Sequence, residues 1–289
     1  MRIIERFFAS KTPHADECED LIFVNPHFAA VIDGVTSKRR EKNEDISTGR
    51  KAATLVYKAL ETLPRTADKE ELFNTLNTAI RNYYLSQHML QEAEIRREFR
   101  CGASVVVYSE YHREVWRVGD CPLMIGTERI DTRKALDNLL SELRACFLET
   151  ELRRGKTIEE LQIFDTSRAY LEEMLSRQIV FQNADEPSPY NYEVIDGFFK
   201  DPERIEVFPV PDPIEFLVLA SDGYPLLKPT LEESEAYLAW ILAEDPLCFR
   251  IFKSTKGLYK GNNSFDDRAY LRLSVKEKKR NKEALTLSV

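Results

Sequence analysis

The sequence has no long apolar run. No stretch of its 289 residues approaches the roughly 18 consecutive apolar residues that a membrane helix requires. Residues 1–10 alternate charged and apolar side chains, without the apolar core or the small-residue cleavage site of a secretory signal. We therefore expect no membrane partner and a cytoplasmic location.

The sequence is also poor in residues for zinc, thiol or triad chemistry. Its five cysteines are scattered, and none forms a CxxC pair or stands near a histidine that would complete a zinc site. Only four histidines are present, and no GxSxG motif occurs, so a serine-hydrolase triad is not supported. The cysteines are predicted to be reduced and mostly structural.

Basic side chains are in the minority. The chain has 41 Lys and Arg against 49 Asp and Glu, and its formal net charge is −8. Because nucleic-acid affinity comes largely from Lys and Arg that neutralise phosphates, we expect no nucleic-acid partner. No internal repeat, low-complexity tract or linker is present. We predict one domain over residues 1–275, followed by a basic tail at 276–289.

Apolar patterns predict a mixture of strands and helices. Short apolar runs between turn residues predict strands at 3–8, 21–24, 28–32, 103–109, 114–118, 214–220 and 268–275. Helical spacing predicts helices at 52–63, 72–90, 136–147 and 230–240. Asp131 or Thr132 is the expected N-cap of the third helix, and Thr230 with Glu233 forms a capping box for the fourth. This order indicates a sheet core with outer helices.

Acidic residues stand at the ends of four predicted strands. The four pairs are Asp33-Gly34, Gly119-Asp120, Asp222-Gly223 and Asp266-Asp267, and Glu19-Asp20 precedes a further strand. Taken singly, an Asp-Gly pair is best explained as a turn. Carboxylates also bind hard cations such as Mg²⁺ and Mn²⁺, and glycine lets the backbone approach the ion. Four such pairs in one domain favour a cation site.

Six short segments carry a resemblance to a known family. They are Cys18-Glu19-Asp20, the AVIDGV run from Ala30 to Val35, Cys101-Gly102-Ala103-Ser104, Val118-Gly119-Asp120-Cys121, the LASDG run from Leu219 to Gly223, and Ser264-Phe265-Asp266-Asp267. In this order, the set resembles the motifs of the PP2C-like, or PPM-type, metal-dependent protein phosphatases. No motif matches between residues 127 and 204, where that family often carries variable helices and a flap.

The resemblance implies an α+β fold, a four-layer α-β-β-α sandwich of two antiparallel sheets flanked by helices, with metal ions at one end. By the same resemblance, Asp33 would bridge two ions and the Gly34 carbonyl would bind one of them. Asp222 and Asp266 would hold the other ion. Asp33, Asp222 and Asp266 would then be the catalytic ligands.

Three further carboxylates complete the implied metal site. Glu19 and Asp20 would act on the ions directly or through water, and Asp120, together with Asp222, would match the position of a third, weaker ion. The implied cofactor is Mg²⁺ or Mn²⁺, as two ions or three. Two divalent ions roughly 3.5–4 Å apart lower the pKa of a bound water and stabilise the charge on phosphoryl oxygens.

The chain departs from the family where substrate phosphate would bind. The family usually has an arginine five residues before the Asp of the Glu-Asp motif, and this position is Ala15 here. His14, Lys11 or the basic run Lys38-Arg39-Arg40 could supply the positive charge. The metal ligands are intact.

These observations predict a metal-dependent serine/threonine protein phosphatase whose partner is a phosphorylated protein substrate. Two alternatives stay open, a phosphatase for a small metabolite and a catalytically silent module that keeps the fold and binds a partner. The variable region 127–204 is expected to govern substrate choice and not chemistry. Oligomeric state is not predicted.

Overall fold

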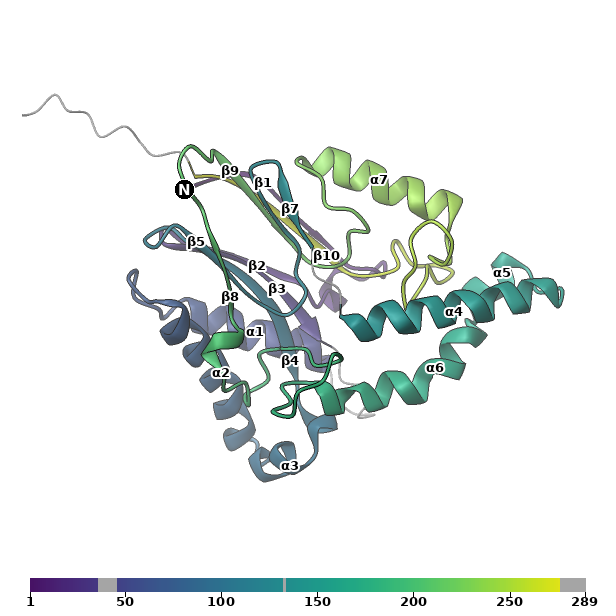
Figure 1. The fold of residues 1–289 in the computed structure, drawn as a ribbon, viewed down its shortest axis with the longest axis horizontal. Helices are drawn as coiled ribbons and strands as arrows, with labels where there is room; N and C mark the ends of the chain where they lie inside the picture. Colours follow the sequence, from purple (N-terminus) through teal and green to yellow (C-terminus); the bar gives the residue numbers. More distant parts are fainter. Residues whose placement is uncertain (36–45, 132–133, 276–289) are drawn as a thin grey trace, which may run out of the picture.

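Two antiparallel sheets form the centre of the molecule (Figure 1). The structure is a computed structural model and describes residues 1–35, 46–131 and 134–275. One five-stranded sheet has the order β2 (Leu21–Val24), β3 (Phe28–Val35), β4 (Gly102–Ser109), β5 (Glu114–Val118) and β8 (Glu206–Pro209). The other five-stranded sheet has the order β1 (Arg2–Ala9), β10 (Arg268–Ser274), β9 (Phe216–Ala220), β6 (Leu123–Ile125) and β7 (Glu128–Ile130). All their strand pairs are antiparallel.

The central strands are apolar on both faces because both faces are covered. On β3, Ala30 and Ile32 pack into the core beneath the helices. Ala29 and Val31, which point the other way, pack into the core between the two sheets with residues of β9 and β10. Successive side chains of a strand point to opposite faces, so a strand between two cores reads as a continuous apolar run.

Helices cover the outer face of each sheet (Figure 1). α1 (Thr48–Leu60) and α2 (Lys69–Ser86) pack on the first sheet, and α7 (Leu231–Glu244) lies over the second. Asp68 and Thr230 cap α2 and α7, since each side chain accepts a hydrogen bond from a backbone N–H of the first turn. The four layers confirm the predicted α-β-β-α fold class.

The segment after β7 extends from one end of the sandwich (Figure 1). It contains α4 (Ala135–Arg153), α5 (Ile158–Ile163), α6 (Thr166–Arg177) and the short 3₁₀ helix η3 (Gln178–Phe181). The next 3₁₀ helix, η4 (Pro202–Arg204), lies back against α2. Leucines of α4 and α6 pack together. The fully buried Arg144 of α4 pairs with Asp165 and donates to the Leu247 and Ser254 carbonyls, which ties this segment to the loop before β10. We call α4, α5, α6 and η3 the flap.

Some predicted element boundaries were wrong. The helix predicted at 72–90 is two helices, because α2 ends at Ser86, His88 has a φ of 58°, and α3 (Leu90–Ile95) follows. α4 begins at Ala135 with Lys134 at the N-cap position, so Asp131 is not its cap, and Thr132 lies outside the described residues. The predicted basic tail at 276–289 lies outside them as well. Two short 3₁₀ helices, η1 (Ala15–Glu17) and η2 (Arg97–Phe99), were not predicted.

Within the described ranges, none of the helices has the length and apolar character needed to cross a membrane.

Candidate metal centre

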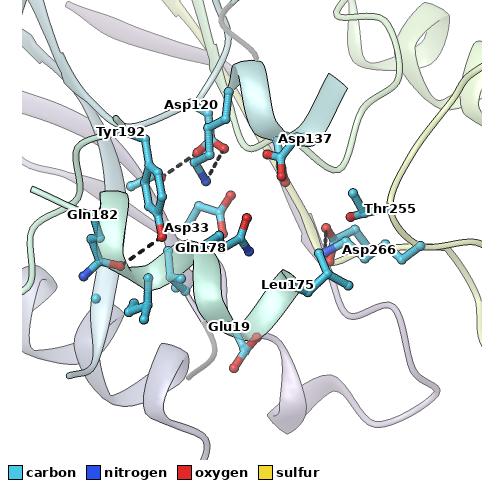
Figure 2. A pocket seen from close by; sticks show the side chains of 18 of the residues that line it. Glu19, Asp33, Asp120, Asp137, Leu175, Gln178, Gln182, Tyr192, Thr255 and Asp266 are labelled. Atoms are coloured by element: carbon cyan, nitrogen blue, oxygen red, sulfur yellow. Dashed lines mark hydrogen bonds and ion pairs between the residues drawn. The ribbon is translucent and has the colours of Figure 1, made fainter. Parts of the chain in front are cut away.

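The carboxylates from the strand ends meet in one cavity of about 190 Å³. The cavity is lined by all seven residues that the sequence placed at the metal ions: Glu19, Asp20, Asp33, Gly34, Asp120, Asp222 and Asp266. Figure 2 shows Glu19, Asp33, Asp120 and Asp266 around the same space. They meet because β3, β5 and β9 end, and β10 begins, at the same end of the sandwich.

Asp33 is not a turn residue. Asp33 and Gly34 lie inside β3, where they pair with Ser104 and Ala103 of β4. A Cβ atom at Gly34 would lie 2.9 Å from the Glu19 carbonyl oxygen and would overlap the backbone of Gly49. The glycine is therefore required by the close approach of two other chain segments, and the turn interpretation fails at this position.

Asp267 holds the loops of the site together. Its Oδ1 accepts a hydrogen bond from the Lys11 backbone N–H at 2.7 Å, and its Oδ2 accepts one from the Glu19 N–H at 3.0 Å. Gly223 packs against the same segment, where a Cβ atom would overlap the Asp267 carbonyl oxygen. Asp267 lines the cavity together with its neighbour Asp266, but its two backbone hydrogen bonds also give it a structural role.

Ser221 links Asp20 to the last strand. Its Oγ donates to Asp20 Oδ2 at 2.5 Å and accepts from the Ala269 N–H at 2.8 Å. On the opposite side, Ser47 Oγ donates to Glu19 Oε1 at 2.5 Å, and the same hydroxyl caps α1. Two serines therefore orient the two acids of the Glu-Asp motif.

Asp33 and Asp222 differ from the other acids of the predicted metal site. Neither side chain makes a hydrogen bond or ion pair with another of the described residues. Burial and the charges of Asp20 and Asp222 raise the pKa of Asp33 well above its ordinary value. Although Asp222 is an exposed residue, desolvation in the cavity and then the charges of Asp266 and Asp120 raise its pKa to about 7. A cation between these carboxylates would relieve this repulsion.

Three lysines also reach the carboxylates. Lys134 Nζ lies 2.8 Å from Asp120 Oδ2, and Lys256 Nζ contacts Asp266 Oδ2. Lys11 Nζ lies 3.3 Å from Asp267 Oδ2 and 3.6 Å from Asp266 Oδ1. Burial is the largest single influence and would raise the pKa of Asp120 and Asp266, but the lysine charges and the hydrogen bonds to each carboxylate together lower both pKa values.

The cavity remains negative in spite of these lysines. Nine acidic and five basic side chains line it, an excess of four negative charges. Two divalent cations would balance that excess, and carboxylate and carbonyl oxygens are the donors that Mg²⁺ and Mn²⁺ prefer. Within residues 1–35, 46–131 and 134–275, no group of three or more His, Cys, Asp or Glu side chains is arranged to hold a metal ion. The fit is therefore one of donor chemistry and charge and not of preformed ligand geometry.

Of the residues predicted to bind substrate phosphate, the structure places only some at the cavity. His14 is exposed and does not line the cavity. Lys38 and Arg39 lie outside the described residues. Lys11, which follows β1, does line the cavity. Lys134 and Lys256 were missed, because both stand in segments without a motif and no local pattern marks them.

Comparisons with known proteins find similar folds. No family model matches the sequence, and no curated protein matches it significantly. The structure is similar to a Mycobacterium tuberculosis serine/threonine phosphatase, PstP/Ppp, at 16% identity and a TM-score of 0.46, covering 94% of this chain and 98% of that one. It is also similar to the serine/threonine phosphatase Stp1 from Staphylococcus aureus, at 15% identity and a TM-score of 0.47, covering 96% of each chain.

A third similar structure is the catalytic domain of PstP in complex with two manganese ions, at 14% identity and a TM-score of 0.46, covering 93% of this chain and 96% of that one. At these values the likeness does not bear on activity, metal content or substrate. Function has to come from the residues of the site.

Proposed function

We propose that this chain is a metal-dependent phosphomonoester hydrolase that acts on phosphoserine and phosphothreonine in proteins. The observation that carries the proposal is the meeting of six carboxylates, from segments far apart in the sequence, around one cavity with an excess of negative charge. Asp33 and Asp222 face this cavity unpartnered, which is costly unless a cation binds between them.

Asp33, Asp222 and Asp266 would hold two Mg²⁺ or Mn²⁺ ions together with the Gly34 carbonyl. When bound, such ions supply water activation and stabilise charge during displacement at phosphorus. The chain itself supplies orientation. Glu19 accepts a hydrogen bond from Ser47, and the buried Asp20 accepts one from Ser221. These two hydrogen bonds fix the orientation of both carboxylates.

The flap supports a protein substrate. Leu175, Gln178 and Ile179 of α6 and η3 line the same cavity as the carboxylates, and so does Tyr192 in the loop that follows. Figure 2 shows Leu175, Gln178 and Tyr192 among the side chains that line the site. This part of the cavity lining has both apolar and polar side chains, so it could contact the residues on either side of a phosphorylated serine or threonine in a peptide.

One observation favours a second candidate, a catalytically silent binding module. Lys134 and Lys256 already pair with Asp120 and Asp266, and Lys11 Nζ lies 3.6 Å from Asp266 Oδ1. In a silent module these ammonium groups would take the place of metal ions. The two candidates differ in whether added metal changes the protein.

Hydrolysis of p-nitrophenyl phosphate and of a phosphothreonine peptide, with Mn²⁺ and with EDTA, tests the proposal. We expect Mn²⁺-dependent hydrolysis of both by the wild type, and loss of both in Asp33→Asn. Asp137→Asn is the matched control, since it removes the same charge from the same cavity lining but lies outside the ligand set.

The remaining outcomes separate the alternatives. Hydrolysis of p-nitrophenyl phosphate without hydrolysis of the peptide would favour a small-metabolite phosphatase. No Mn²⁺-dependent hydrolysis of either compound would favour the silent module.

A further inference from the structure

Asp120 has both carboxylate oxygens engaged. Ser104 Oγ donates to Oδ1 at 2.6 Å, and Lys134 Nζ lies 2.8 Å from Oδ2. The two charged side chains are largely buried, with exposed fractions of 9% for Asp120 and 18% for Lys134. This is a shielded, charge-assisted contact and not a surface ion pair.

Lys134 is held in place from several sides. Its Nζ lies 5.0 Å from the centroid of the Tyr192 ring, within the range of a cation–π interaction. Its charge also acts on Asp137, one turn into α4, and on Asp222 across the cavity. The side chain leaves the backbone at the N-cap position of α4, where the flap begins. The ammonium therefore contacts Asp120 and its charge acts on Asp222, and these are the two acids at which a third ion was expected.

A metal ion at Asp120 would have to displace this ammonium. It would take the oxygen that Lys134 contacts and leave a buried lysine without its counter-charge, which is strongly unfavourable. No lysine in the described part of the chain pairs with Asp33, so an ion there meets no such obstacle. An ion at Asp266 would displace Lys256, whose side chain is 33% exposed and can turn towards solvent, whereas the side chain of Lys134 is only 18% exposed.

We propose that Lys134 is a built-in cation at Asp120, so that this centre takes two divalent ions and excludes a third. The inference rests on the proposed function for the two ions themselves. A covalently attached charge at this position does not depend on the free metal concentration, and it anchors the start of the flap to the edge of the first sheet. Lys134 is thus a positioning residue that replaces a weakly held ion.

The number of Mn²⁺ ions bound per chain, measured by calorimetry and by equilibrium dialysis with elemental analysis, tests the proposal. We expect two ions in the wild type and a third, weaker ion in Lys134→Met, which keeps the length of the side chain but removes its charge. In Lys134→Met/Asp120→Asn the affinity for the third ion should fall further, by more than the roughly tenfold that loss of an outer-shell partner costs. Lys260→Met, an exposed lysine on the loop before β10, is the matched charge control and should bind two ions.

Asp120→Asn in the otherwise wild-type chain gives an answer that does not depend on the folding of the Lys134 variant. It should still bind two ions, because Asp120 holds none, and Asn can still accept from Ser104. Three ions in the wild type, with one lost in Asp120→Asn, would overturn the role of Lys134 and leave the proposed function standing. A folded Lys134→Met that binds only two ions would do the same. A wild type that binds no Mn²⁺ would overturn the proposed function and the two-ion count together.

Discussion

Replacing Asp33 by Asn should abolish metal-dependent turnover without destabilising the metal-free protein. Within the described chain, the Asp33 side chain accepts no hydrogen bond that the change could break. Its negative charge is instead repelled by Asp20 and Asp222, which together with burial raises its pKa. Removing that charge in EDTA should therefore leave the free energy of unfolding unchanged or slightly higher.

Asp267→Asn is the internal contrast. Asp267 accepts hydrogen bonds from the backbone N–H groups of Lys11 and Glu19 on different oxygens, and an Asn amide can accept only one of them. A buried N–H left facing an amide NH₂ costs about 1–3 kcal/mol. For a chain of this length, each kcal/mol lowers the melting temperature by roughly 2–4 °C. Two aspartates of one site should thus respond to the same substitution with different signs.

Thermal melts in EDTA, set beside Mn²⁺-dependent rates, measure both effects. Asp222→Asn should behave like Asp33→Asn, since none of the described residues pairs with Asp222 either. Asp266→Asn should be intermediate, because Asp266 pairs with Lys256 and Lys11 when metal is absent. A melting temperature of Asp33→Asn that falls as far as that of Asp267→Asn, with activity retained, would show that Asp33 is a structural residue and would refute the reasoning.

Three further predictions concern the same site. In EDTA, lowering the pH from 8 towards 5 should raise the melting temperature, and saturating Mn²⁺ should remove the effect. The reason is that Asp222, with its pKa raised to about 7, takes up a proton in the folded protein that the unfolded chain does not bind in this range. A melting temperature that falls over the same pH range would contradict this prediction. Ser221→Ala should lower the free energy of unfolding in urea melts by about 1–3 kcal/mol, because it leaves Asp20 and the Ala269 N–H unpaired in a buried position. Ser86→Ala, on the exposed end of α2, is the control and should change the free energy of unfolding little. Ile179→Ala should raise KM for a phosphothreonine peptide and leave hydrolysis of p-nitrophenyl phosphate nearly unchanged; an equal loss on both substrates would mean that the flap takes part in the chemistry.

The sequence by itself determined the fold class and the elements that carry carboxylates. Strand and helix periods are local, so the run from Phe28 to Ile32 and the capping box at Thr230 predicted β3 and the start of α7. The ordered motifs then placed acids at strand ends, and antiparallel strands of one sandwich bring such ends together. Boundaries were less accurate: the break at His88 depends on a single backbone conformation that no apolar pattern encodes.

Only the tertiary structure decided how the charges of the site are balanced. Lys134 and Lys256 stand in motif-free segments, and they reach Asp120 and Asp266 only because the flap and the loop before β10 fold over the same end of the sandwich. The different roles of Asp266 and Asp267, adjacent in the chain, could not be predicted either. Both line the cavity, and only the structure shows that Asp267 also ties two loops together. The physical reason is that periodicity reports which face of an element is buried, whereas the partner of a charge depends on where distant segments meet in space.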